Sequence, residues 1–266
     1  MTHNKKSFIS AFNDIARHKH RYKVFEDFVT MSAISLHNAI NKNEVLEKEY
    51  MTIQAKYSKE EVRAFGRLLG MLVELLQDEP KDILGQLYME LEIGNSNTGQ
   101  FFTPDSVSVM MAKILYGDKI VLPDCGFITM SEPACGAGGM VLAFVKELTG
   151  QKLDPARTFW VQCIDIDRTV ALMCYIQLSL WNVPAQIIVG NTLSLEFREQ
   201  FFTPAYYLFN WNYKLRKRNK ELAENKEKSV SEETKTEVEK SEPSSQPMTE
   251  IVEVDEIVQL DLFKNL

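Results

Sequence analysis

The chain has 266 residues, 45% of them hydrophobic, which is enough for one α/β core with an accessory segment. No apolar run approaches the roughly 18 residues of a transmembrane helix, and Met1–Lys6 lack the apolar stretch of a signal peptide, so we expect a cytoplasmic protein. The four cysteines form no Cys-x-x-Cys pair, and only four histidines accompany them. This pattern argues against a disulfide framework and against a metal site.

The net charge of −7 is distributed unevenly. Glu221–Leu266 contain 13 acidic and 5 basic residues, a net charge of −8, which leaves residues 1–220 at +1. The acidity therefore belongs to the tail and does not exclude nucleic-acid binding by the body. Two basic clusters could neutralise phosphates or form ordinary solvated helix surface. They are Arg17, Lys19, Arg21 and Lys23, and then Lys214, Arg216, Lys217, Arg218 and Lys220.

Residues 1–92 are predicted to form a helical N-terminal segment. Apolar residues recur at helical spacing around Phe8 and Phe12, around Phe25 and Phe28, and from Val62 to Leu76. A further short helix is expected over residues 82–91. The run Gly94–Gly99 is loop-forming and separates this helical segment from the next part of the chain.

Residues 93–215 are predicted to form an α/β domain with a parallel sheet, because β-rich and helical strings alternate. The expected strands are residues 128–131, 159–164 and 186–189, and the expected helices are residues 139–148 and 168–180. Residues 205–209 look like a fourth strand. From residue 216 to 257 the composition predicts a disordered acidic linker, because Glu, Lys, Ser and Thr cannot bury enough apolar surface.

A glycine-rich loop, Glu132–Gly139, follows a predicted strand and opens a predicted helix. Glycines allow a tight turn and a close approach of the backbone to a ligand, and the helix N-terminus favours a polar group. Asp165 and Asp167 stand at the end of the next strand, at the spacing of a ribose-binding acid. Asp167 is also well placed to cap the helix that begins at Arg168.

Three motifs in order resemble the modification subunits of type I restriction systems, which are S-adenosylmethionine (SAM)-dependent DNA adenine-N6 methyltransferases. The motifs are Gly99–Pro104, Glu132–Gly139 and Gly190–Leu193, and the resemblance covers about residues 82–193. It implies a Rossmann-like, truncated SAM-binding domain, followed here by a disordered tail, with DNA and a specificity subunit as partners.

The resemblance also implies residue roles. Thr103 and Pro104 start a helix that faces the methionine end of SAM, and Glu132 lies near its ammonium group. Asp165 holds the ribose hydroxyls. The remaining cofactor residues implied by the family are Cys135, Gly136 and Gly138, which pass under SAM, and Asn191, near its adenine, where the family usually has Asp.

The Asn/Asp-Pro-Pro-aromatic motif of adenine-N6 enzymes is missing. In that motif a side-chain oxygen and a proline carbonyl accept hydrogen bonds from the target amine, and the aromatic ring stacks on the flipped base. Asn210 and Tyr213 are the best catalytic candidates by position, and a surface loop is the competing interpretation. Three alternatives follow. The first is a SAM-dependent DNA adenine methyltransferase, with or without a partner subunit for specificity, in which Asn210 and Tyr213 are the target-base residues. The second is an inactive SAM-binding regulator tethered to the replication sliding clamp or to DNA, and the third is a SAM-using enzyme for another substrate.

Residues 258–266 contain a short peptide motif, Gln259, Leu260, Asp261, Leu262 and Phe263. It resembles the peptide with which bacterial proteins bind the replication sliding clamp, where two apolar side chains enter a pocket. The end of a flexible tether suits such a docking peptide. A last helical turn packed on the body is the alternative.

Overall fold

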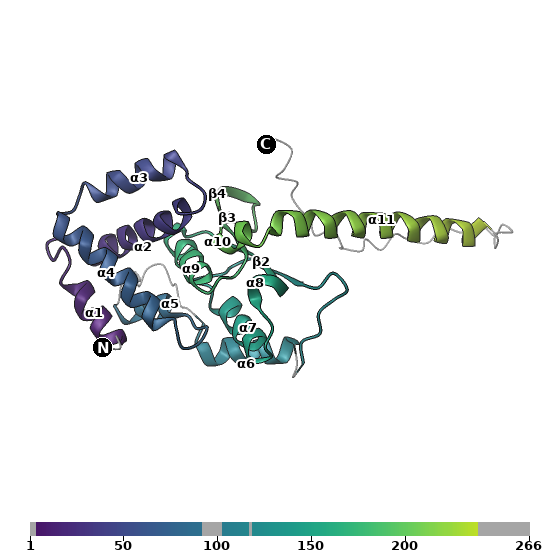
Figure 1. Ribbon diagram of the computed structural model, residues 1–266, viewed down its shortest axis with the longest axis horizontal. Coiled ribbons are helices and arrows are strands. Elements are labelled where there is room, and N and C mark those ends of the chain that lie inside the picture. The colour runs from purple at the N-terminus through teal and green to yellow at the C-terminus, as the bar shows by residue number, and fades with distance from the viewer. Residues whose placement is uncertain (1–3, 92–102, 117–118, 239–266) are drawn as a thin grey trace. The chain divides into compact units, whose positions relative to one another are not determined.

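The computed structural model describes residues 4–91, 103–116 and 119–238 (Figure 1). Residues Met1–Arg218 form one compact unit, and Asn219–Leu266 form a second. The elements before the sheet are α1 (Lys5–Asn13), α2 (Arg21–Asn38), α3 (Glu44–Gln54), α4 (Lys59–Leu75), α5 (Ile83–Glu90) and α6 (Asp105–Tyr116). The elements from the first strand onward are β1 (Ile128–Glu132), α7 (Gly139–Gly150), α8 (Pro155–Thr158), β2 (Phe159–Asp165), α9 (Arg168–Leu180), β3 (Ala185–Asn191), β4 (Glu196–Phe202), α10 (Pro204–Leu208) and α11 (Trp211–Val238).

The N-terminal helices begin at side chains that satisfy free backbone N–H groups. Asn4 and Ser7 form a capping box at α1, and Ser58 and Glu61 form another at α4. The apolar faces of α1, α2 and α4 meet in a core that includes the edge-to-face pair Phe8 and Phe28, with ring centroids 6.0 Å apart. The predicted helical character of this segment is confirmed.

The sheet has the order β1-β2-β3-β4. β1, β2 and β3 are parallel, with Glu132 opposite Cys163 and Asp165 opposite Val189. The predicted βαβαβ unit is confirmed, because α7 and α9 provide the two crossovers. β4 pairs antiparallel with β3, and a register shift falls between Val189 and Gly190.

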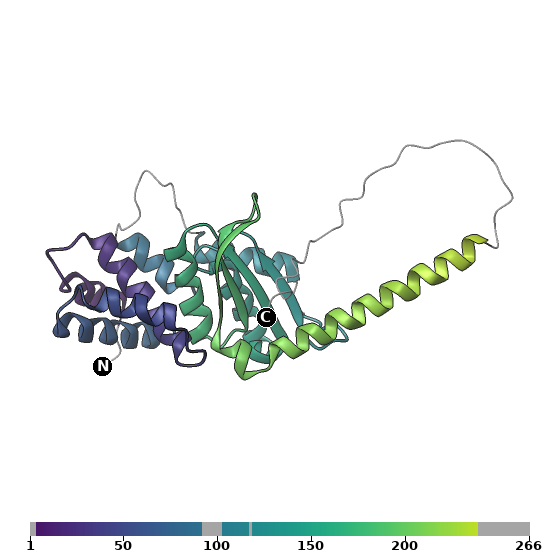
Figure 2. The same cartoon turned by 90° about the horizontal axis from the view of Figure 1, so that it is seen from above.

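Helices cover one face of the sheet in layers (Figure 2). Phe144 of α7 packs on Phe159 with ring centroids 4.9 Å apart, and Tyr175 of α9 packs on Phe201 at 5.7 Å. α6 lies against α7, and α2 lies against α9. α9 is thus buried between the sheet and the N-terminal helices, which explains why ten of its side chains are buried, from Thr169 to Leu178.

The other face of the sheet is more polar. A small aromatic cluster, Phe127, Trp160, Tyr206 and Trp211, packs there. Beside it a row of amides crosses three strands: Gln162 Nε2 donates to Gln186 Oε1, and Gln186 Nε2 donates to Gln200 Oε1, both at 3.0 Å.

Two expectations differ from the structure. Residues 205–209, predicted as a strand, lie mostly in α10, because Thr203 and Pro204 start a helix. The fourth strand is β4 instead, whose charged, edge-exposed sequence lacks clear apolar alternation. The segment predicted to be disordered from residue 216 is helical as far as Val238, where Lys and Glu favour a helix, as in the Lys220–Glu224 pair.

The clamp-like peptide, residues 258–266, and the rest of the predicted linker after Val238 lie outside the described residues. Among the helices that the structure describes, none is long and apolar enough to cross a membrane.

Candidate functional site

The polar residues at the ends of the three parallel strands gather at one edge of the sheet. Glu132 ends β1, Asp165 ends β2 and Asn191 ends β3. The carboxyl ends of neighbouring parallel strands meet, so the register brings these three side chains to the same edge, called here the carboxyl edge. In open α/β sheets this is the edge where ligands bind.

The glycine-rich loop turns sharply above this edge. Gly136 and Gly138 both have positive φ, +55° and +93°. A Cβ at Gly138 would meet the Cys174 sulfur at 2.9 Å, so only glycine fits there. Gly138 also occupies the N-cap position of α7. Gly138 is therefore required by its close packing on α9, and the turn brings the backbone of the loop to a helix N-terminus, which favours a polar ligand group.

Asp165 is anchored to this loop. Its Oδ2 accepts a hydrogen bond from Gly136 N at 2.9 Å, and its Oδ1 accepts one from Asp167 N at 2.9 Å. Burial raises the pKa of the Asp165 carboxyl, and the two backbone N–H groups oppose that rise. Each oxygen keeps a lone pair that can accept a hydroxyl of a ligand.

The structure separates the two aspartates that the sequence left ambiguous. Asp167 Oδ1 accepts from Thr169 N at 2.8 Å and from Val170 N at 3.2 Å, so Asp167 caps α9. Asp165 is the acid that faces the glycine-rich loop.

The remaining predicted cofactor residues flank the same edge. Asn191 Oδ1 accepts from Leu193 N at 2.9 Å, which shapes the turn from β3 to β4. Thr192 Oγ1 donates to Pro133 O at 2.6 Å and ties that turn to the glycine-rich loop. Glu132 is half-buried, and its Oε1 accepts from Ala134 N at 3.4 Å.

Thr103 and Pro104 are exposed and precede α6. The helix begins at Asp105, and Pro104 O accepts from Ser108 N at 3.1 Å, so Pro104 takes the N-cap position. The start of the helix lies one residue later than the sequence predicted. Residues 99–102 of the first motif lie outside the described residues.

The sequence did not lead us to predict the buried hydrogen bonds that hold the glycine-rich loop from beneath. Gln177, in the middle of α9, is fully buried, and its Nε2 donates to Ala137 O at 2.8 Å and to Asp82 Oδ1 at 2.9 Å. Asp82 is also buried and caps α5 through Gly85 N at 2.7 Å. A glutamine inside an otherwise apolar helix was the available signal, since a buried amide needs partners.

Asn210 and Tyr213, the predicted catalytic residues, lie away from the carboxyl edge. Trp211, between them, donates its indole N–H to Ala156 O in α8, which directly precedes β2. They therefore flank the amino end of β2, and Asp165 stands at its carboxyl end, roughly 20 Å away along seven residues. The antiparallel β4 carries the chain back to that opposite edge. The structure does not bring these two side chains to the glycine-rich loop.

The N-terminal basic cluster is engaged within the chain. The Arg21 guanidinium donates to Ile15 O at 2.9 Å and to Ala16 O at 2.5 Å, beyond the end of α1. Lys23 pairs with Glu26 at 2.6 Å. These contacts favour a structural role for this cluster over phosphate binding.

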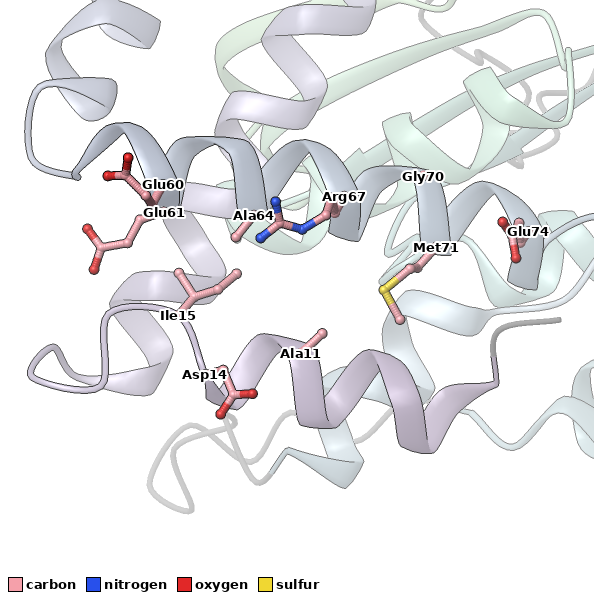
Figure 3. Close-up of a pocket in the computed structure, with 10 residues that line it drawn as sticks. All are labelled: Ala11, Asp14, Ile15, Glu60, Glu61, Ala64, Arg67, Gly70, Met71 and Glu74. Carbon is pink, nitrogen blue, oxygen red and sulfur yellow. The ribbon is translucent and has the colours of Figure 1, made fainter. Parts of the chain in front are cut away.

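A cavity of about 540 Å³ lies between α1 and α4 (Figure 3). Ala11, Ile15 and Met71 form its apolar wall, and Glu60 and Glu61 lie at its rim. All its lining residues come from α1, α4 or the residues just after α1, so it is separate from the carboxyl edge.

Comparison with known protein families assigns the chain to one of them. The family described as N-6 DNA Methylase matches residues 79–239, more than half of the chain. The type I restriction enzyme MpnII methylase subunit of Mycoplasma pneumoniae (strain ATCC 29342 / M129 / Subtype 1) is 24% identical over 195 residues, which are 70% of this chain and 32% of the relative. The chain thus spans about a third of the length of that curated relative.

Two solved structures are also similar. One is described as a class I S-adenosylmethionine-dependent methyltransferase from Listeria monocytogenes, with 15% identity and a TM-score of 0.34 over 68% of this chain and 51% of that one. The other is the type I restriction-modification system methyltransferase subunit from Streptococcus thermophilus, with 12% identity and a TM-score of 0.32 over 68% and 57%.

Proposed function

Because this chain belongs to the N-6 DNA methylase family, we propose that it binds SAM at the carboxyl edge and takes part in methylating the N6 amine of adenine in DNA. SAM is the cofactor of this family, and it supplies an electrophilic methyl group. The observation that carries the proposal is the Asp165–Gly136 contact, 2.9 Å, which fixes a carboxylate beside a side-chain-free turn.

The residues at the carboxyl edge match the chemical groups of SAM. Asp165 accepts hydrogen bonds from the ribose hydroxyls, and Gly136, whose N–H binds Asp165, puts no side chain between the turn and the cofactor. The Glu132 carboxylate lies at the end of β1, where it attracts the methionine ammonium. Asn191 offers an amide to the adenine edge, and α6, preceded by Thr103, closes the methionine end.

The acceptor base needs groups that the described residues do not place at the carboxyl edge. The Asn/Asp-Pro-Pro-aromatic motif is missing from its 266 residues, and Asn210 and Tyr213 flank the opposite edge. We therefore propose that the base-gripping residues lie outside these 266 residues, in a polypeptide partner that assembles with them. In that complex this chain positions the methyl donor, and the partner polarises the amine and stacks on the base.

Transfer of labelled methyl from SAM to unmethylated DNA tests this assignment. The chain alone should bind SAM without methylating DNA, and addition of host extract or of a co-encoded subunit should restore transfer. SAM binding without transfer under every condition would instead identify an inactive SAM-binding regulator. Absence of SAM binding would overturn the proposal altogether.

We also propose that Gln259–Phe263 dock on a bacterial sliding clamp. The support is the sequence alone: Leu262 and Phe263 are adjacent apolar anchors, and Gln259 fixes the register. Pull-down with purified clamp should recover the wild-type chain but not the Leu262→Ala/Phe263→Ala variant. Equal recovery of the two would exclude docking through this peptide.

A further inference from the structure

Three buried thiols converge beneath the glycine-rich loop. Cys135 lies in the loop, Cys163 in β2 and Cys174 in α9. Their Sγ atoms all lie within 4.8 Å of one another, and their exposed fractions are 6%, 0% and 0%. Three elements that are far apart in sequence thus present sulfur to one point.

The fold creates this triangle, and cysteine spacing could not reveal it. β1 and β2 are parallel, with Glu132 opposite Cys163, and Cys135 follows three residues after Glu132. Cys135 N donates to Ile164 O at 2.9 Å, which holds the loop over β2. Gly138 leaves the space that the Cys174 sulfur fills. The sequence-based expectation of no metal site rested on the missing Cys-x-x-Cys pair, and the parallel sheet supplies the convergence instead.

We propose that Cys135, Cys163 and Cys174 bind one soft metal ion of low coordination number, with Cu(I) as the best match. A metal–sulfur bond of about 2.3 Å puts the three sulfurs of a trigonal site about 4.0 Å apart, which lies inside the 4.8 Å limit of the triangle. Thiolates select soft ions such as Cu(I).

The ligand set argues against zinc. Structural zinc takes four ligands in a tetrahedron. No histidine or carboxylate joins the three thiols among the residues that the structure describes. The site is also enclosed by the core, so a three-coordinate ion fits it better. Three metal–sulfur bonds form, no electron is transferred, and each thiol that becomes a ligand releases its proton to the solution.

Such an ion would link the glycine-rich loop to β2 and α9 directly. The loop carries Gly136, whose N–H holds Asp165, so the metal and cofactor sites share one segment of backbone. Metal binding itself does not depend on the proposed methylation function, and it can be measured without SAM or DNA.

The test is Cu(I) titration of the reduced full-length chain under anaerobic conditions, with a colorimetric Cu(I) chelator as competitor. Cys125 provides the matched control, because it is the exposed cysteine. The wild type and Cys125→Ala should each bind one ion, with charge-transfer absorption in the ultraviolet and a raised melting temperature. Changes in groups around a metal ligand already cost about 10–100-fold in affinity, so Cys163→Ala or Cys174→Ala should lose at least about 100-fold.

X-ray absorption of the wild-type complex gives a readout that does not depend on how the variants fold. Three sulfur neighbours at about 2.3 Å support the site. The proposal would be overturned by fewer than three sulfur neighbours or by no binding to the wild type. It would equally be overturned by loss of binding in Cys125→Ala or by equal affinity in all variants.

Discussion

Gln177 and Asp82 form a buried hydrogen bond of 2.9 Å that joins α9, beneath the glycine-rich loop, to the start of α5. The Gln177 Oε1 also accepts from Ile83 N at 2.8 Å and from Leu84 N at 3.0 Å, and its Nε2 donates to Ala137 O. The Gln177 side chain therefore donates two hydrogen bonds and accepts two. It satisfies the start of α5 and the glycine-rich loop at once.

Replacing this amide should destabilise the fold strongly. Gln177→Leu leaves the Leu84 N–H and the Ala137 carbonyl buried without a partner. It also removes one donor from Asp82 and one acceptor from Ile83, whose N–H keeps its bond to Lys81 O. Each unsatisfied group costs about 1–3 kcal/mol. We expect the free energy of unfolding in urea to fall by about 3 kcal/mol or more. Gln162→Leu, on the polar face of the sheet, is the matched control and should cost less than about 1 kcal/mol. Equal losses would contradict the assigned role of Gln177.

Asp82 should make stability fall as pH rises. Burial raises the pKa of its carboxyl above the ordinary value of 3.8, despite the opposing hydrogen bonds from Gln177 and Gly85 N. Between that value and the folded-state pKa, the unfolded chain has lost the proton and the folded chain retains it, so unfolding becomes easier with increasing pH.

The Asp82→Asn variant isolates this contribution, because Asn also caps helices and its oxygen can accept the same two bonds. Relative to the wild type, it should gain stability as pH rises above about 3.8 and lose that advantage at lower pH. Urea unfolding at a series of pH values measures the difference. A difference that does not vary with pH would show that the Asp82 pKa is not raised.

Replacing Arg168 by lysine should lower the stability of the fold by a small, salt-dependent amount. Its guanidinium holds both carboxylate oxygens of Glu199, at 2.8 and 2.9 Å, and both of Glu49, at 3.0 and 2.9 Å. The Nη1 and Nη2 atoms hold Glu49 as a bidentate pair and Nε is shared by the two Glu199 oxygens, a fixed arrangement that lysine cannot reproduce. Since the three groups are partly exposed, we expect Arg168→Lys to cost only about 1 kcal/mol, and less at high salt. Equal unfolding midpoints of wild type and variant at low salt would contradict this.

We expect DNA binding to depend on the basic residues at the start of α11, between Lys214 and Lys220, and not on the N-terminal basic cluster. Lys217→Ala/Arg218→Ala should weaken DNA binding and reduce the slope of log affinity against log salt by about 0.9 for each lost phosphate contact. Arg17→Ala/Lys19→Ala is the control, because Arg17 pairs with Asp14 and Lys19 lies over the Tyr57 ring. The opposite pattern would place the DNA on the N-terminal helices.

Local patterns were sufficient to predict the parallel sheet, its two crossover helices and the glycine turn, because each depends on short-range periodicity and turn chemistry. β4 was missed because its charged edge sequence carries no strong alternation. The Thr203-Pro204 pair could have corrected residues 205–209, since the same pair at Thr103 predicts a helix start. The convergence of Cys135, Cys163 and Cys174 depends on strand register, which no local pattern encodes.

The central claim, that the carboxyl edge binds SAM, is tested most directly by calorimetric titration of the wild type, Asp165→Ala and Asp167→Asn with SAM. Losing hydrogen bonds to a charged acceptor costs about 1.5–3 kcal/mol, so Asp165→Ala should bind about 10- to 100-fold more weakly. Asp167→Asn keeps the helix cap and should bind like the wild type. The claim would be contradicted if Asp165→Ala bound SAM as tightly as the wild type, or if the wild type did not bind SAM.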